Sequence, residues 1–109
     1  MELTYKGYNY HMVLDINSMA EIQEKIGSFS QWCEEVGKPE PVLKALIIGY
    51  TAMINEATEI DIDENGETKP FLTEKQVGRM ITKYSLRKLA SEVRDELIRS
   101  VNSDESKNA

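Results

Sequence analysis

The sequence is poor in several residue types, and each shortage narrows what the chain can be. Its 109 residues include one cysteine, Cys33, which excludes an internal disulfide framework and favours a reducing compartment. The one histidine, His11, has neither metal-ligand spacing nor an orienting acid beside it. No glycine-rich phosphate loop, nucleophile elbow, CxxC or HExxH motif occurs. We therefore expect no enzyme activity, no cofactor and no metal.

Long apolar runs and an excess of basic residues are also missing. The longest apolar segment, residues 42–54, contains Lys44 and is shorter than the ~20 residues of a membrane span. No basic region followed by an apolar stretch stands at the start, so no signal peptide is expected. The formal charge of -6 argues against a general binder of nucleic acid or anionic membranes. These absences predict a cytoplasmic protein.

The composition is that of one small globular domain. Hydrophobic residues make up 40% of the chain and charged residues 29%, which is enough for a modest core. Residues 1–101 are predicted to form a single globular domain, and residues 102–109, almost without apolar side chains, a disordered tail. The predicted fold class is mostly α (α+β), a small bundle of four to five helices with an N-terminal β-hairpin packed on it.

Residues 2–14 alternate with the period of two that is typical of a β-hairpin. Lys6-Gly7 supplies a two-residue turn between the two runs. The apolar face of this hairpin is expected to pack on helices, because an isolated hairpin is barely stable in water. The expected register places Tyr5 opposite Tyr8 and Leu3 opposite Tyr10.

Apolar periodicity and capping signals predict five helices after the hairpin. Ser18 with Glu21 has the spacing of a capping box, and Pro41 suits the first turn of a helix. The apolar side chains within each segment recur with the helical period of about 3.6 residues. The predicted helices cover residues 17–27, 29–36, 41–58, 73–84 and 86–101.

Residues 59–70 form an acidic segment whose middle partly matches a calcium-binding loop. The stretch 61–66 fits the first six positions of the EF-hand pattern. Lys69 and Leu72, however, stand where the ninth and twelfth positions require oxygen ligands. A solvated acidic loop, with its Asn-Gly pair at the tip, is the preferred interpretation.

The predicted helix 41–58 carries more apolar surface than one face accounts for. One stripe has the i, i+4, i+8 spacing of a core-facing helix, and it includes Leu43 and Ile47. A second strip, formed by Ala45, Ile48 and Ala52, lies outside it. Either the helix is the centre of the bundle, or this strip is exposed for a partner or for self-association. We take Ala45, Ile48 and Ala52 as the predicted protein-binding residues.

Basic residues gather in the last third of the chain. Residues 73–101 carry 7 basic and 4 acidic groups, whereas residues 1–72 carry 5 and 13. A small helix-turn-helix-like DNA-binding regulator is therefore one alternative function, and a generic cytosolic adaptor protein is another. Two features count against DNA binding. The link at Tyr84-Ser85 looks shorter than the usual turn of about three to four residues, and acidic residues are scattered through the last helix.

The order of the segments carries a family resemblance. The hairpin LTYKGYNYHMVLD (residues 3–15) runs into INSMAEIQEKIG (16–27), followed by LKALIIGY (43–50) and LTEKQVGRMI (72–81) before a polar tail. This order resembles the tail assembly chaperones of long-tailed (siphovirus-like) phages and prophages of Gram-positive bacteria. The similarity covers most of residues 3–101. The acidic segment 59–70 and the helix around Trp32 are not matched.

The resemblance implies a function in protein assembly. Chaperones of this family bind the tape-measure protein and help recruit tail-tube subunits during tail morphogenesis. They act in the host cytoplasm and are not part of the mature virion. The implied partners are thus a tape-measure protein and a tail-tube protein, with no nucleic acid and no membrane. A helical tape-measure protein exposes apolar stripes, and a bundle with a spare apolar strip can cover them.

Overall fold

The N-terminal hairpin forms with the register that its turn dictates. The computed structural model describes the chain from Leu3 to Asn108, and the surroundings of its side chains from Leu3 to Ser100. Lys6 and Gly7 have φ values of 50° and 85°, as a type I′ turn requires. Strands β1 (Leu3–Tyr5) and β2 (Tyr8–Tyr10) pair antiparallel, with Leu3 opposite Tyr10 and Tyr5 opposite Tyr8. Leu3 and Tyr10 are buried and Tyr8 is exposed, so the end of the hairpin away from the turn enters the core.

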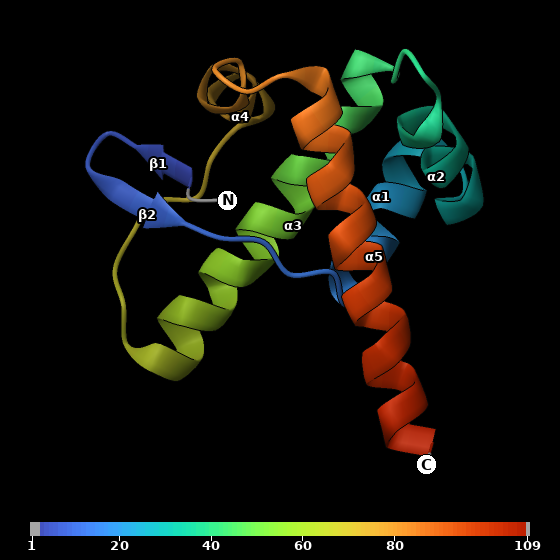
Figure 1. Ribbon diagram of the computed structural model, residues 1–109. Helices are drawn as coiled ribbons and strands as arrows, with labels where there is room; N and C mark the ends of the chain where they lie inside the picture. The colour runs from blue at the N-terminus through green and yellow to red at the C-terminus, as the bar shows by residue number, and fades with distance from the viewer. Residues whose placement is uncertain (1–2, 109) are drawn as a thin grey trace.

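The hairpin is shorter than the predicted range of residues 2–14. After Tyr10 the chain leaves the sheet and crosses helix α3 (Leu43–Asn65) as an extended segment (Figure 1). There the backbone N–H of Val13 donates to the carbonyl of Met53 at 3.2 Å. The period-two pattern continues past the strand because an extended chain alternates its side chains whether a strand or a helix lies beside it.

Two short helices follow, each begun by a side-chain cap. In α1 (Ile16–Ile26), Asp15 Oδ1 accepts from the N–H of Ser18 at 3.0 Å, and Ser18 Oγ accepts from the N–H of Asp15 at 2.9 Å. The capping box therefore pairs Asp15 with Ser18, and the predicted pairing of Ser18 with Glu21 was wrong. Helix α2 (Phe29–Gly37) begins as predicted after Ser28, whose hydroxyl accepts from a backbone N–H one turn on.

Helix α3 runs well past its predicted end at residue 58. Residues 59–65, predicted as loop, continue the helix, which ends at Gly66 with φ 67°. The Asn-Gly pair is thus a helix C-terminus, where glycine adopts the left-handed conformation at little cost. Burial explains the extra length, because Asp61 is buried and extends the covered face of the helix. Pro41 lies before the helix and not in its first turn.

The last two helices begin as predicted and end elsewhere. Helix α4 (Glu74–Ile81) starts with the capping box of Thr73 and Gln76 and stops short of residue 84. Helix α5 (Leu86–Asn108) continues where a disordered tail of residues 102–109 was predicted, and Ala109 lies outside the described residues. That stretch contains no glycine or proline, and each added residue of a growing helix gains one backbone hydrogen bond.

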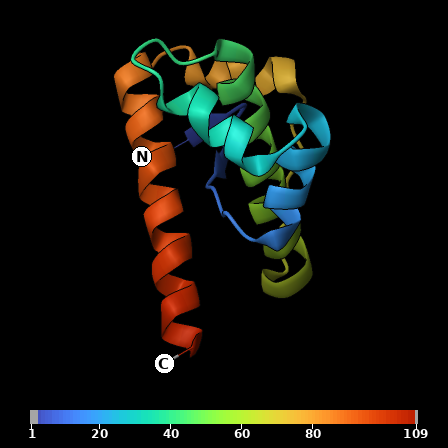
Figure 2. The same ribbon diagram turned by 90° about the vertical axis from the view of Figure 1, so that its right-hand side faces the viewer.

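Helix α3 lies at the centre, and the other elements surround it (Figures 1 and 2). Helices α1, α2 and α4 and strand β2 pack on α3, and α5 packs on α2. Tyr50 of α3 donates its hydroxyl to the carbonyl of Leu89 in α5 at 2.8 Å. This arrangement confirms the predicted fold class, a mostly α bundle of five helices with a two-stranded hairpin packed on it. No helix between Leu3 and Asn108 is long and apolar enough to cross a membrane.

Helix α2 packs closely on α3 at Gly49. Trp32 is fully buried and its Nε1 donates to the carbonyl of Ala45 at 2.9 Å. A Cβ on Gly49 would lie 2.3 Å from Cζ2 of this indole, so glycine is required for the ring to reach the helix backbone. The segment around Trp32, unmatched by the family resemblance, is therefore an integral part of this core.

Candidate functional site

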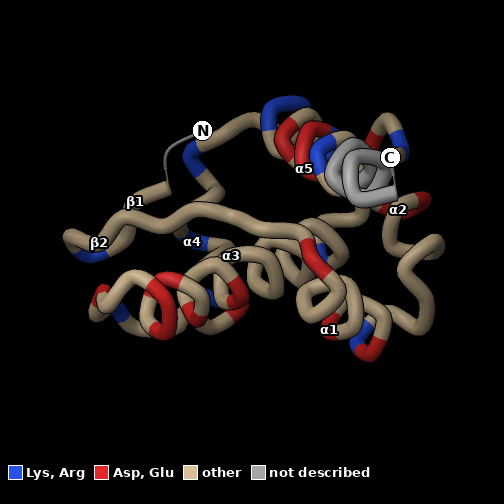
Figure 3. The backbone as a smooth tube through the Cα atoms, turned by 90° about the horizontal axis from the view of Figure 1, so that it is seen from below, with Lys and Arg blue, Asp and Glu red and all other residues tan. Residues whose placement is uncertain are grey.

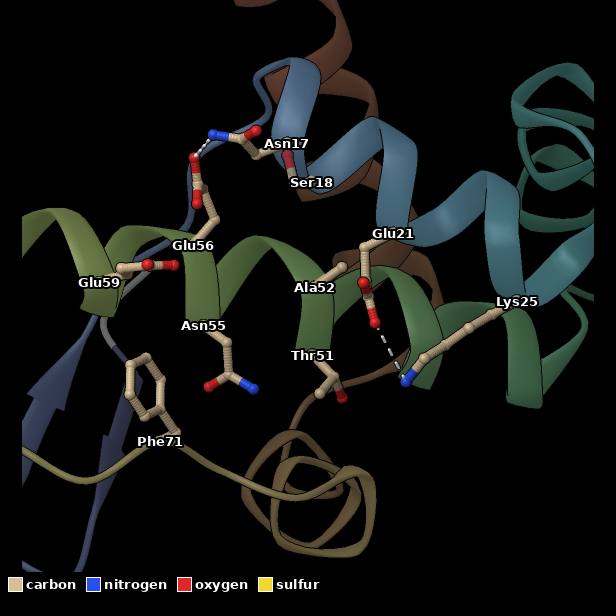
Figure 4. Close-up of a pocket in the computed structure, with 10 residues that line it drawn as sticks. All are labelled: Asn17, Ser18, Glu21, Lys25, Thr51, Ala52, Asn55, Glu56, Glu59 and Phe71. Carbon is tan, nitrogen blue, oxygen red and sulfur yellow. Dashed lines mark hydrogen bonds and ion pairs between the residues drawn. The ribbon is translucent and has the colours of Figure 1, made fainter.

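The predicted protein-binding residues are buried inside the chain. Ala45, Ile48 and Ala52 are 1%, 7% and 7% exposed. Helix α2 covers the first part of this strip through Trp32, and α1 lies beside Ala52 across a small cavity (Figure 4). Of the two interpretations of the second apolar strip, the structure matches the one in which α3 is the centre of its bundle. The strip is not an exposed docking face in this structure.

The cavity between α1 and α3 is mostly polar, and most of its polar groups have partners within the chain. It encloses about 270 Å³ and is lined by the ten residues drawn in Figure 4. Asn17 Nδ2 donates to Glu56 Oε2 at 3.0 Å. The hydroxyls of Ser18 and Thr51 donate to backbone carbonyls, at 3.2 and 2.7 Å, so neither is held as a nucleophile. The bond between Asn17 and Glu56 joins α1 to α3, whereas the Ser18 and Thr51 hydroxyls bond to carbonyls four or five residues away in the chain.

The histidine lies in an ionic cluster that sequence reasoning missed. Asp61 is 4% exposed, and its Oδ2 lies 2.8 Å from both His11 Nε2 and Lys69 Nζ. Lys69 also donates to the carbonyl of Asn9 at 2.8 Å. Burial opposes ionisation of Asp61, but the hydrogen bonds from Lys69 and His11 outweigh it and lower the pKa of Asp61. The cluster joins β2, α3 and the segment before α4.

This cluster is structural. A histidine beside an aspartate becomes catalytic when it activates a nucleophile, whereas here the shared carboxylate oxygen is neutralised by Lys69. The calcium-loop pattern of residues 61–66 forms the last turn of α3 and its cap, not a loop. Within residues 3–100 no three acidic, histidine or cysteine side chains gather as metal ligands do. Burial raises the pKa of the Cys33 thiol, which keeps it protonated at neutral pH.

A groove at one end of the molecule carries exposed apolar side chains. It lies where the starts of α3 and α5 meet α4, at the top of Figure 1, and encloses about 450 Å³. Leu43 and Leu86 line it and are 58% and 44% exposed. Ile47 also lines the groove and is half-buried. The deeper walls of the groove are formed by the buried residues Leu46, Ile81 and Leu89. An exposed apolar opening of this kind is typical of surfaces that bind another molecule.

The predicted core-facing stripe of α3 is buried at Leu46 and from Tyr50 onward, and within the helix only its first turn departs from the sequence interpretation. Leu43 and Ile47 were assigned to the core-facing stripe, yet they line the open groove. Ala45 and Ile48 were assigned to the outer strip, yet they are buried. Periodicity separates the two faces of a helix, but it does not say which one is covered when both are apolar.

The groove continues along α4 into a second hollow with a basic edge. Ile47, Gly78 and Thr82 line both hollows, and the second one encloses about 400 Å³. Its edge contains three cations and one acid: Lys44, Lys75, Arg79 and Glu74. Glu74 accepts from Lys44 at 2.8 Å, whereas Lys75 and Arg79 form no ion pair with the described side chains. We call the two hollows together the α3–α4–α5 groove.

The geometry of α4 and α5 overturns the first argument made against DNA binding and weakens the second. The link comprises residues 82–85, the length of a helix-turn-helix turn, so the expected short link was wrong. The acidic side chains of Glu92 and Glu96 are 13% and 11% exposed, so they do not stand out toward a bound phosphate, whereas Asp95 is exposed and still counts against one. Nevertheless, α4 packs mainly on α3 and β1, and the open groove occupies the space between α4 and α5.

Comparison with known proteins adds no relative. Family models, curated proteins and solved structures were compared with the chain, and none of them matches. The α3–α4–α5 groove is therefore interpreted from its own chemistry, which is an apolar floor with exposed leucines at one end and cations at the other.

Proposed function

We propose that this chain is a phage or prophage tail assembly chaperone. In this role it binds the tape-measure protein and helps recruit tail-tube subunits during tail morphogenesis in the host cytoplasm. The observation that carries the proposal is the α3–α4–α5 groove, where Leu43 and Leu86 are exposed although the chain has a filled core elsewhere. An apolar groove of this kind suits an apolar stripe on a helix, which a long helical tape-measure protein would present. The resemblance in segment order supports the same function.

Coexpression tests this proposal. The tape-measure protein encoded beside this chain should be largely insoluble when made alone, because its apolar stripes are uncovered. With this chain it should become soluble and copurify. A small helical protein of similar charge, expressed at the same level, is the control. Unchanged solubility, or flanking genes that encode neither a tube nor a tape-measure protein, would reject the proposal.

A small helix-turn-helix-like DNA-binding regulator is the second candidate, favoured by the four-residue link between α4 and α5. Its weakness lies at the start of α5, where a recognition helix contacts base edges. Exposed Leu86 stands there, beside exposed Leu43 of α3. A generic cytosolic adaptor protein would use the same groove and differ only in its partner, so the coexpression experiment separates it from a tail chaperone.

A further inference from the structure

We propose that the α3–α4–α5 groove binds an amphipathic helix that has acidic residues flanking its apolar face. The inference deepens the proposed function and rests on it, since it names the chemistry of the partner segment. It concerns a surface that the sequence did not indicate, because Leu43 and Ile47 were assigned to the core.

The shape of the groove favours a helix as the occupant. Its two hollows share Ile47, Gly78 and Thr82, so they form one continuous channel of adjoining volumes. Apolar side chains on one face of a helix recur about every turn, at ~5.4 Å, and successive ones would enter successive hollows. Gly78 adds no side chain between them, which lets the backbone of a partner approach closely.

The charge of the groove favours an acidic partner. Lys75 and Arg79 are four residues apart on α4, so they project from the same face of that helix. Neither forms an ion pair with the described side chains, and Glu74 already accepts from both Lys44 and Lys25. The edge is therefore positive in a chain whose formal charge is -6. Glutamates beside the apolar face of a partner would pair with these cations, and lysines would be repelled.

The apolar content distinguishes a protein partner from a nucleic acid. Phosphates would pair with Lys75 and Arg79, but they would leave Leu43 and Leu86 facing water. An amphipathic helix satisfies both halves of the groove at once. Duplex DNA is therefore an outcome of the test and not the proposal.

Fluorescence anisotropy with the full chain and two synthetic peptides tests the inference. Each probe is a helix-stabilised peptide of about 15 residues, long enough for about four turns. One peptide has leucines along a single face and glutamates flanking them, and the other has lysine in place of every glutamate. The glutamate peptide should bind at least about tenfold more tightly, and added salt should reduce this difference.

Matched variants of the chain locate the binding site. Leu43→Glu changes an exposed groove residue and should weaken binding of the glutamate peptide about tenfold or more. The double change Lys75→Glu with Arg79→Glu should reverse the preference between the two peptides. Ile16→Glu, at a residue 78% exposed on α1, and Lys6→Glu, on the hairpin turn, are the controls and should leave binding unchanged. Circular dichroism melting verifies that each variant is folded.

Several results would overturn the inference. These are equal affinities for the two peptides, no binding of either, full binding to the folded Leu43→Glu chain, or tighter binding of a duplex of about 20 base pairs. The proposed function fails separately. If the glutamate peptide binds as expected and the tape-measure protein does not copurify, the groove inference stands alone. If the tape-measure protein copurifies equally with the Leu43→Glu chain, the function stands and the groove inference falls.

Discussion

At the scale of single residues, two helical glycines should respond in opposite ways to the same substitution. Gly49→Ala places a Cβ 2.3 Å from the Trp32 ring, and this overpacking should lower the free energy of unfolding by about 1–3 kcal/mol. Gly78→Ala places a Cβ 3.6 Å from Ile47 Cδ1, an ordinary contact. It should raise the free energy of unfolding by ~0.5–1 kcal/mol, because alanine loses less backbone freedom than glycine on folding. Urea unfolding measures both, and effects of the same sign would contradict this account.

Asp61 is the residue whose loss should cost the most among the charged groups. Asp61→Asn leaves Lys69, which is 9% exposed, without its buried carboxylate and with only the exposed Glu67 at 3.7 Å, and should lower the free energy of unfolding by ~3 kcal/mol at neutral pH. Combining it with Lys69→Met should recover much of this loss, because no buried charge then remains unpaired. Urea unfolding of both variants against the parent chain measures the difference.

The same cluster predicts a dependence on pH. The folded pKa of Asp61 lies below its ordinary value, so folding favours the ionised form. The ionised Asp61 therefore contributes its full share to the free energy of unfolding above the ordinary carboxyl pKa. This contribution is lost as the pH falls through the pKa of Asp61 in the folded protein. The difference in the free energy of unfolding between the parent chain and the Asp61→Asn variant should be largest at about pH 7 and much smaller at about pH 2. A gap that does not change with pH would mean that the charge of Asp61 is not what stabilises the fold.

At the scale of helices and strands, local signals predicted where elements begin, and tertiary contacts decided where they end. The turn at Lys6-Gly7 fixes the hairpin register from two neighbouring residues, and the capping box at Thr73 fixes the start of α4. The end of α3 was missed because Asp61 is held in the helix by partners distant in sequence. Lys69 is the one basic residue in the acidic segment 59–70, and it was the one indication in the sequence that this segment forms a buried ion pair.

The candidate site was missed for a related reason. Its residues come from three helices, and a single sequence does not show which apolar side chains remain uncovered once the helices pack. The start of α3 presents Ala45 to Trp32, and Leu43, two residues earlier and so on the other side of the helix, remains exposed. The fold class was therefore predictable from periodicity, whereas the groove that we propose as a partner surface was not.

Glu74 joins three helices, and its removal should loosen their packing. Its carboxylate lies at the start of α4 and accepts from Lys44 of α3 at 2.8 Å and from Lys25 of α1 at 3.1 Å. These hydrogen bonds lower the pKa of Glu74, so its contribution is present above the ordinary pKa and lost as the pH falls through the folded value. Because the side chain is 26% exposed, Glu74→Gln should lower the free energy of unfolding by only about 1 kcal/mol.

Thermal unfolding at two ionic strengths checks the role of Glu74. The effect of Glu74→Gln should shrink at about 1 M salt, where ions screen the contacts with both lysines. Glu24→Gln, on the exposed side of α1, is the matched control and should change the melting temperature little. An effect that is independent of salt would indicate lost packing and not lost ion pairs.

At the scale of the whole molecule, charge is unevenly distributed. Acidic residues recur along α3 (Figure 3), whereas the exposed cations of α4 lie beside the groove. The net charge of -6 repels a polyanion at long range. At short range, a polyanion would meet only the few cations at the edge of the apolar groove. If the groove binds an acidic segment as we propose, that segment must also bury apolar surface to offset the net repulsion.

The chain should therefore not bind duplex DNA in a sequence-dependent way. A specific complex would need base contacts from the first turn of α5, where exposed Leu86 stands, and phosphate contacts strong enough to overcome the net negative charge. An electrophoretic shift assay at physiological salt, with a set of unrelated duplexes and the promoter region upstream of the chain's own gene, should show no preference among them. Weak binding that is equal for all sequences and disappears with added salt would agree with this expectation, because it reports cations alone. Nanomolar binding that distinguishes one duplex from the others would instead place the helix-turn-helix-like regulator ahead of the chaperone.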